Sequence, residues 1–277
     1  MMRSLLVLIF ISFIRINSFA QSTTEWFPAD INIQPFAAHF LEPKSGFQYL
    51  FEPEKVRIDI GTSQDIIHWI DKNHTFSAGA DFFTYTRARA EADFKFPVET
   101  IDYLFGINGS YKFKTEKTEW GVRLRFSHIS AHLVDGYYDS ETDNWLNDYQ
   151  PFTYSKEFFE LMPYYKFHGV RFYAALTYII HIVPTDIAKG IYGGGFDYYA
   201  VQLNIPTFTP YIGYDFELNG IADTYFGNNI FTAGIKFGQP ESRGFSIFTS
   251  YYSGKSVHGE FYKITEDYWT IGINLDI

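Results

Sequence analysis

Alternation of apolar residues with polar or small ones is the sequence feature that most constrains this fold. Apolar side chains occupy every second position from Phe231 to Phe237, and the last segment repeats the pattern from Trp269 to Ile277. A period of two places alternate side chains on opposite faces of a β-strand. The charged residues of these segments, Lys236 and Asp276, keep to the polar parity. One face therefore suits lipid and the other a wet interior, as in transmembrane β-barrels.

The same pattern along the chain predicts an all-β fold, a closed antiparallel transmembrane β-barrel of about 12 strands. An even number of strands lets both ends of the sheet close on the same side, so that no edge stays unpaired in lipid. We expect the strands at residues 31–41, 55–65, 74–87, 98–114, 119–132, 155–167, 170–183, 190–201, 206–218, 227–238, 243–254 and 266–277.

Loop lengths indicate how such a barrel would sit in the membrane. Outer-membrane barrels have short periplasmic turns and long extracellular loops. A soluble lipocalin-like barrel or a sandwich is the alternative fold, because alternating strands also build those. The asymmetry of the connections favours the membrane barrel, with short turns at 115–118, 168–169 and 239–242, and longer loops at 133–154, 184–189, 219–226 and 255–265.

The N-terminus predicts export. Residues 1–20 combine Arg3, an apolar run from Leu5 to Ile14, and small residues before Gln21, the pattern of a cleaved signal peptide. A retained anchor is the alternative, but this run of ten residues is too short to span a bilayer as a helix. Residues 21–277 then form one outer-membrane barrel domain of a Gram-negative cell. A net charge of −10 argues against nucleic acid as a partner.

Charged residues of both signs fall on the inward parity of the predicted strands. Such side chains can pair across the lumen of a 12-stranded barrel, which is narrower than a porin. We therefore favour a plugged barrel over a conducting one, and a narrow, charge-selective channel is the alternative. The inward set consists of Arg57, Asp59, Asp81, Lys112, Arg123, Arg125, Glu160, Lys166, Arg171, Asp215, Glu217 and Lys236.

The segment Arg125–His132 carries the most suggestive chemistry. Parity counted from Trp120 turns His128 and Ser130 outward, side by side, near the outer end of a strand. The next strand turns Glu157 outward at a similar height. A nucleophilic serine needs a base and a third group that orients that base. Ser130, His128 and Glu157 are thus candidate nucleophile, base and orienting acid, and polar residues at the lipid headgroup level are the alternative.

This outward His-x-Ser pair resembles the arrangement in two families of membrane-embedded barrels, outer-membrane phospholipase A and the lipid A deacylases. The resemblance implies hydrolysis of an acyl ester of a phospholipid or of lipid A in the outer leaflet. Over most of the chain, a wider resemblance is to an uncharacterised family of outer-membrane barrels that is classed as a domain of unknown function. It rests on the segments Ser127–Asp135 and Tyr251–Tyr262, and it implies a membrane barrel without a defined reaction.

The remaining polar residues leave other roles open. His181, Ser256 and His258 map to outer strand ends, either as rim residues or as a second constellation with Asp135. The histidines lack metal-ligand spacing, so we expect no metal and no cofactor. A non-enzymatic channel or surface-binding barrel is the competing function, with loop 134–154 as the display surface. The expected partners are outer-membrane lipids, lipopolysaccharide and, during insertion, the barrel-assembly machinery.

Overall fold

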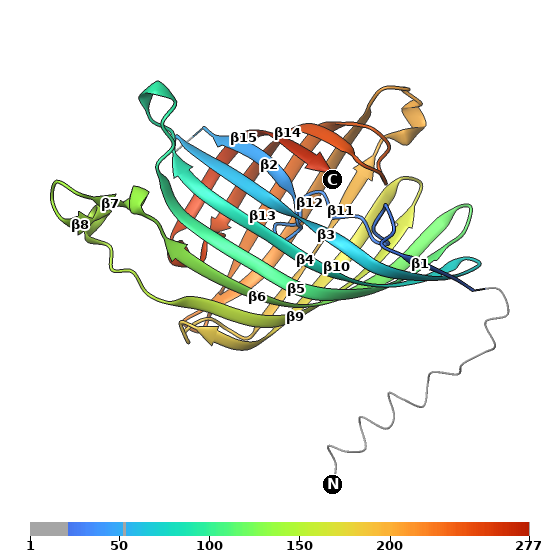
Figure 1. Cartoon of the computed structure of the whole chain (residues 1–277), viewed down its shortest axis with the longest axis horizontal. Coiled ribbons are helices and arrows are strands. Elements are labelled where there is room, and N and C mark those ends of the chain that lie inside the picture. Colours follow the sequence, from blue (N-terminus) through green and yellow to red (C-terminus); the bar gives the residue numbers. More distant parts are fainter. Residues whose placement is uncertain (1–21, 52–53, 277) are drawn as a thin grey trace, which may run out of the picture.

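Twelve antiparallel strands close into a ring in the computed structural model, which describes residues 22–51 and 54–276 (Figure 1). Within the ring, consecutive strands pair along the chain, and β15 pairs with β2 to complete the circle. Closure removes the unpaired edges that an open sheet would expose. The ring consists of β2 (Ser45–Leu50), β3 (Lys55–Asp71), β4 (His74–Arg89), β5 (Val98–Lys114), β6 (Thr118–Leu133), β9 (Tyr154–Phe167), β10 (Val170–Val183), β11 (Gly190–Tyr199), β12 (Thr209–Ile221), β13 (Thr224–Phe237), β14 (Gly244–Lys255) and β15 (Thr265–Asp276).

The connections differ between the two ends of the barrel, as predicted. We call the end with turns 72–73, 115–117 and 168–169 the inner end, and the end with loops 134–153 and 256–264 the outer end. In Figure 1 the outer end, with the hairpin of β7 (Tyr138–Asp139) and β8 (Asn144–Trp145), lies on the left. None of the helices in the described residues is long and apolar enough to cross a membrane.

One predicted outer loop is wrong. Residues 219–226 form the ends of β12 and β13, which are joined by Ala222 and Asp223 alone. Both residues have positive φ, of 47° and 65°. Two central residues with positive φ are typical of the tight hairpin turn whose twist matches that of the strands. The two turn residues are Ala-Asp rather than the usual Asn-Gly or Asp-Gly, and the Asn219-Gly220 pair of this segment lies within β12 instead of at the turn.

The predicted first strand at residues 31–41 is also wrong. β1 (Thr23–Trp26) and β2 both pair with one edge of β3, near its two ends, and residues 27–44 leave the wall between them. We call residues 27–44 the lumen segment, because its side chains from Ile31 onward are buried or half-buried inside the barrel. Ile31 and Ile33 alternate with Asn32 and Gln34 as in a strand, but Pro35 cannot donate a ladder hydrogen bond. Apolar side chains of the segment pack in the lumen, among them Phe36, which is 1% exposed.

The lumen segment is held by buried arginines of the wall. The guanidinium of Arg123 binds Glu42 through both of its terminal nitrogens, one of them 3.0 Å from Glu42 Oε2. Arg125 Nη1 donates to the carbonyl of Leu41 at 2.9 Å, and Arg171 lies over the ring of Phe36 at 4.2 Å. The inward charges thus pair within the lumen, as expected, and part of this pairing is with the lumen segment rather than across the wall.

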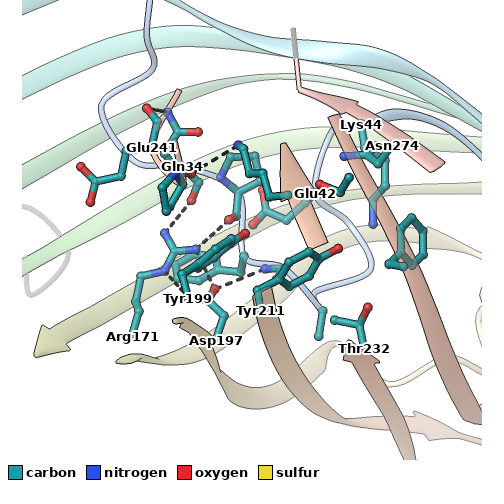
Figure 2. A pocket seen from close by; sticks show the side chains of 18 of the residues that line it. Gln34, Glu42, Lys44, Arg171, Asp197, Tyr199, Tyr211, Thr232, Glu241 and Asn274 are labelled. Carbon is teal, nitrogen blue, oxygen red and sulfur yellow. Dashed lines mark hydrogen bonds and ion pairs between the residues drawn. The ribbon is translucent and has the colours of Figure 1, made fainter. Parts of the chain in front are cut away.

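A polar cavity of about 290 Å³ lies beside the lumen segment towards the inner end. Figure 2 shows Arg171 beside Asp197, which accepts from it at 2.7 Å, and Glu241 near Gln34. Glu241 belongs to the inner turn 238–243 and accepts from Lys114 Nζ at 3.0 Å and from Lys166. Burial opposes ionisation of this carboxyl, but the two lysines outweigh it and lower the pKa of Glu241 to about 2. These contacts fold the turn towards the ends of β5 and β9.

The loops of the outer end pack on one another through aromatic rings. The ring centroid of Phe261 in loop 256–264 lies 5.2 Å from that of Tyr137. In the same loop, His258 Nδ1 lies 2.8 Å from Asp102 Oδ2 of β5. Burial first, and the nearby arginines Arg87 and Arg57 second, lower the pKa of His258 well below its ordinary value. The loop is therefore fixed to the barrel wall by a buried histidine.

Candidate active site

Three neighbouring strands bring a carboxylate and two imidazoles together on the outward surface. The register pairs His128 of β6 with Glu157 of β9, and Glu157 with His181 of β10. Residues alternate between surface and lumen along β6, so that Arg125 and Ser127 are buried while Phe126 is exposed. The parity that places His128 and Ser130 outward in the sequence is the parity observed.

Glu157 accepts hydrogen bonds from both histidines. His128 Nδ1 lies 2.6 Å from Glu157 Oε1, and His181 Nδ1 lies 2.7 Å from Glu157 Oε2. The side chains of His128 and Glu157 are 26% and 28% exposed, whereas that of His181 is 62% exposed. An Nδ1–H donated to a carboxylate leaves Nε2 as the basic nitrogen of a neutral imidazole. Glu157 therefore sets the tautomer of His128.

A β-bulge in β10 explains why His181 contacts Glu157. The pairing of β10 with β9 shifts between Ile179 and His181, so that Ile180 has no partner opposite it. The extra residue reverses the parity of the strand beyond it, and Ile180 and His181 are both exposed. Period-two reasoning cannot detect this shift, so the sequence placed His181 at the rim without assigning it to Glu157.

Ser130 lies one outward position nearer the outer end than His128. It pairs with Ser155 of β9, and Ser155 pairs in turn with Val183 of β10. Among the residues that the structure describes, no hydrogen bond joins Ser130 Oγ to His128. Catalytic hydrogen bonds are often long in enzymes without substrate and tighten when it binds. The roles of Ser130, His128 and Glu157 in catalysis stay predictions.

The surroundings of this cluster are apolar. Towards the inner end, Phe126 and Phe159 form an exposed aromatic pair with ring centroids 5.0 Å apart, beside the exposed Tyr178. The ring of Phe105 lies 4.8 Å from that of His128. Towards the outer end there is a hollow of about 620 Å³, with Val183 in its lining. The cluster is thus set between an apolar band and an apolar hollow; Tyr149, Phe152, Pro184, Phe261, Tyr262 and Ile264 also line the hollow.

The second constellation considered in the sequence, His181, Ser256 and His258 with Asp135, does not come together in the structure. His258 binds Asp102, and Ser256 Oγ accepts from the backbone N–H of His258 at 3.4 Å. Asp135 lies in a short 3₁₀ turn at the start of the long outer loop, and no described hydrogen bond or ion pair links it to either residue. Ser256 and His258 are buried, so this group fixes a loop rather than facing lipid.

The closed ring, the outward apolar band and the loop asymmetry define the outer-membrane type of β-barrel. Residues 95–276 match a family model described as "Protein of unknown function (DUF1207)". The chain belongs to this family, in agreement with the resemblance found in the sequence. No curated protein has a sequence that matches this chain.

Solved structures share the architecture at low sequence identity. Outer membrane phospholipase A from Escherichia coli is 10% identical, with a TM-score of 0.56 over 89% of this chain and 94% of that chain. An active-site mutant of that phospholipase, asparagine to alanine, has a TM-score of 0.55 at the same identity and coverage. The β domain of the Bordetella autotransporter BrkA reaches 0.44, at 10% identity over 84% of this chain and 97% of that chain. The two phospholipase structures support the fold alone.

The predicted signal peptide at residues 1–20, with its cleavage position before Gln21, lies outside the described residues.

Proposed function

We propose that this chain is an outer-membrane barrel that hydrolyses acyl esters of lipids at its outward surface. One observation carries the proposal, the 2.6 Å contact between His128 Nδ1 and Glu157 Oε1 on a lipid-facing surface, with Ser130 two residues further along the same strand. Polar groups that face lipid are costly, and they mark functional sites more often than structural ones. An oriented imidazole beside a hydroxyl is the arrangement that activates a serine.

The mechanism follows from the assigned tautomer. His128 Nε2 takes the proton of the Ser130 hydroxyl while Oγ attacks the ester carbonyl, and Glu157 stabilises the imidazolium that forms. When the tetrahedral intermediate collapses, the imidazolium gives its proton to the departing alcohol, and the acyl group stays on Ser130. Water activated by His128 then releases the fatty acid and restores the serine.

The substrate class follows from the surroundings. In a bilayer, the exposed aromatic pair Phe126–Phe159 would contact the acyl chains of the lipids. Because Ser130 lies nearer the outer end than this pair, it would lie at the height of the ester groups. Phospholipids and the acyl esters of lipid A are the two lipid classes of an outer leaflet that fit this position. Export through a cleaved signal peptide and insertion by the barrel-assembly machinery are part of the same proposal.

A barrel without enzymatic activity is the second candidate. The buried lumen segment favours the surface-binding form of such a barrel over a narrow conducting channel, because the segment and ion pairs such as Arg123–Glu42 occupy part of the lumen. In that case the outer loops would bind a partner, and the histidines would contact only lipid headgroups. Stable conductance steps in planar bilayers would instead support the channel.

An assay of lipid products distinguishes the lipid hydrolase from the barrel without enzymatic activity. The full chain is reconstituted in vesicles that contain phospholipid and lipopolysaccharide, and released fatty acids and deacylated lipids are measured by mass spectrometry. Ser130→Ala is expected to lose activity by about 10³-fold or more. Ser253→Ala is the matched control, because Ser253 lies on β14, which pairs with β13 and β15 and not with the strands of the cluster, and this variant is expected to stay active. An active Ser130→Ala variant, or a wild type without products, overturns the proposal.

A further inference from the structure

A histidine of the lumen segment meets two carboxylates of the barrel wall deep in the interior. His39 Nδ1 lies 3.3 Å from Asp215 Oδ1 and 3.6 Å from Glu217 Oε1. One ligand atom from each residue lies within 4.8 Å of the other two. Asp215 and Glu217 are two residues apart on β12 and both face the lumen, whereas His39 is 176 positions from Asp215. The site therefore exists only when the lumen segment is in place.

We propose that His39, Asp215 and Glu217 bind a divalent transition metal ion of the Zn²⁺ class, which fastens the lumen segment to the wall. Zinc lies about 2.0–2.2 Å from nitrogen and oxygen ligands. In tetrahedral geometry, that distance separates neighbouring ligand atoms by about 3.3–3.6 Å. The two distances from His39 Nδ1 fall in this range. An imidazole nitrogen with carboxylates suits zinc better than calcium or magnesium, which prefer all-oxygen sites.

The partners around the three ligands match those of metal sites. A metal-bound histidine usually donates its other ring N–H to a carboxylate, which orients the ring. His39 Nε2 lies 3.5 Å from Glu160 Oε2 and is otherwise a buried nitrogen without a hydrogen-bond partner in the described structure. Glu160 is in turn held by Arg125 at 2.6 Å, and Tyr173 donates to Asp215 Oδ1 at 2.5 Å. The ligands are thus oriented by the residues behind them.

There is also room for the remaining ligands of an ion. A cavity of about 90 Å³ borders the carboxylates of Asp215 and Glu217. A water molecule occupies about 30 Å³ in the liquid, so the cavity has room for about three waters. Lys156 and Lys255 line the same cavity, so a metal ion competes with ammonium groups for Glu217. The side chain of Glu217 is 18% exposed, so an ion can reach the site from this cavity.

A protonated His39 is the rival explanation for the same geometry. An imidazolium would donate to Asp215 from Nδ1 and to Glu160 from Nε2, and it would bind no metal. The two explanations differ in one measurable property, because coordination requires an unprotonated Nδ1.

Metal binding is tested on the full chain refolded in detergent micelles, stripped with a chelator and titrated with Zn²⁺ by calorimetry. Co²⁺ serves as the spectroscopic probe, since its visible absorption reports nitrogen and oxygen coordination. The expected result is one equivalent of bound metal in the wild type. His39→Gln and Glu217→Gln are each expected to weaken binding by at least about 10–100-fold.

Two controls make the outcome decisive. His68→Gln removes another buried histidine, which lies 2.7 Å from Asp65, and is expected to leave binding unchanged. Glu217→Gln keeps the test valid if His39→Gln fails to fold, because Glu217 is the most exposed of the three ligands. Wild-type protein that binds no metal, or that binds it equally without His39 or Glu217, overturns the proposal in favour of the imidazolium or of adventitious surface binding. Lipid hydrolysis by Ser130 is a separate outcome, measured in the absence of added metal.

Discussion

Replacing Glu42 with glutamine tests how the lumen segment is held. The carboxylate of Glu42 receives two hydrogen bonds from Arg123, and the two side chains are 2% and 7% exposed. Hydrogen bonds to charged groups contribute about 1.5–3 kcal/mol each. The amide introduced by Glu42→Gln would keep one acceptor and lose the charge, while Glu160, 4.0 Å from Arg123, would offset part of the loss. We expect the free energy of unfolding to fall by about 2–3 kcal/mol.

The measurement is equilibrium unfolding of the refolded barrel in micelles, followed by tryptophan fluorescence in urea. A second variant, Glu42→Gln with Arg123→Met, is expected to recover part of the stability, because no unpaired guanidinium remains buried. Lys114→Gln is the control, since this side chain is 53% exposed and its ion pairs contribute less than about 1 kcal/mol. A Glu42→Gln variant within about 0.5 kcal/mol of the wild type would refute the reasoning.

Two further predictions concern the inner turn and the wall. The pKa of Glu241, about 2 against an ordinary 4.5, means that its stabilising effect is present above pH 4.5 and is lost as the pH falls towards 2. Wild type and Glu241→Gln should therefore differ at pH 6, by less than about 1 kcal/mol for this half-exposed group, and converge near pH 2 in urea unfolding. At Gly61, a Cβ would overlap the carbonyl oxygen of Phe82 and the Cβ of Phe83, so Gly61→Val is expected to lower stability by about 1–3 kcal/mol. Gly109→Val is its control, because a Cβ there meets only Ser77 O at 3.5 Å, and equal losses in both variants would contradict the steric argument.

The wall of the barrel could be predicted because one rule governs it. Each wall strand has lipid on one face and lumen on the other, so the period of two appears directly in the sequence. β5 and β10 have the predicted bounds, 98–114 and 170–183. The outward positions of His128 and Ser130 follow from the same parity. The neighbourhood of Glu157 could be predicted because His128 and Glu157 lie at about the same distance from the inner ends of their strands, where Thr118 pairs with Phe167.

The positions of the lumen segment, His181 and His39 depend on long-range contacts that no local sequence pattern indicates. The lumen segment begins with strand-like alternation at Ile31 and Ile33, and its contacts with Arg123 and Arg171 show that it leaves the wall. The bulge at Ile180 moves His181 to the outward face by a single extra residue. His39 meets Asp215 across 176 residues, so no spacing in the sequence could relate them. Contacts between residues far apart in the sequence determine the positions of the lumen segment, His181 and His39.

Covalent labelling of Ser130 tests the central proposal most directly. An alkyl fluorophosphonate reacts with an activated serine, forming an Oγ–phosphorus bond and releasing fluoride, and intact-protein mass spectrometry counts the adducts. We expect one adduct per chain, located at Ser130 by peptide mapping. This adduct should be lost in His128→Gln and retained in Ser253→Ala, because Ser253 lies on β14, away from the cluster. A wild-type protein that is folded in vesicles and stays unlabelled, or that is labelled at another serine, would contradict the assignment of Ser130, His128 and Glu157.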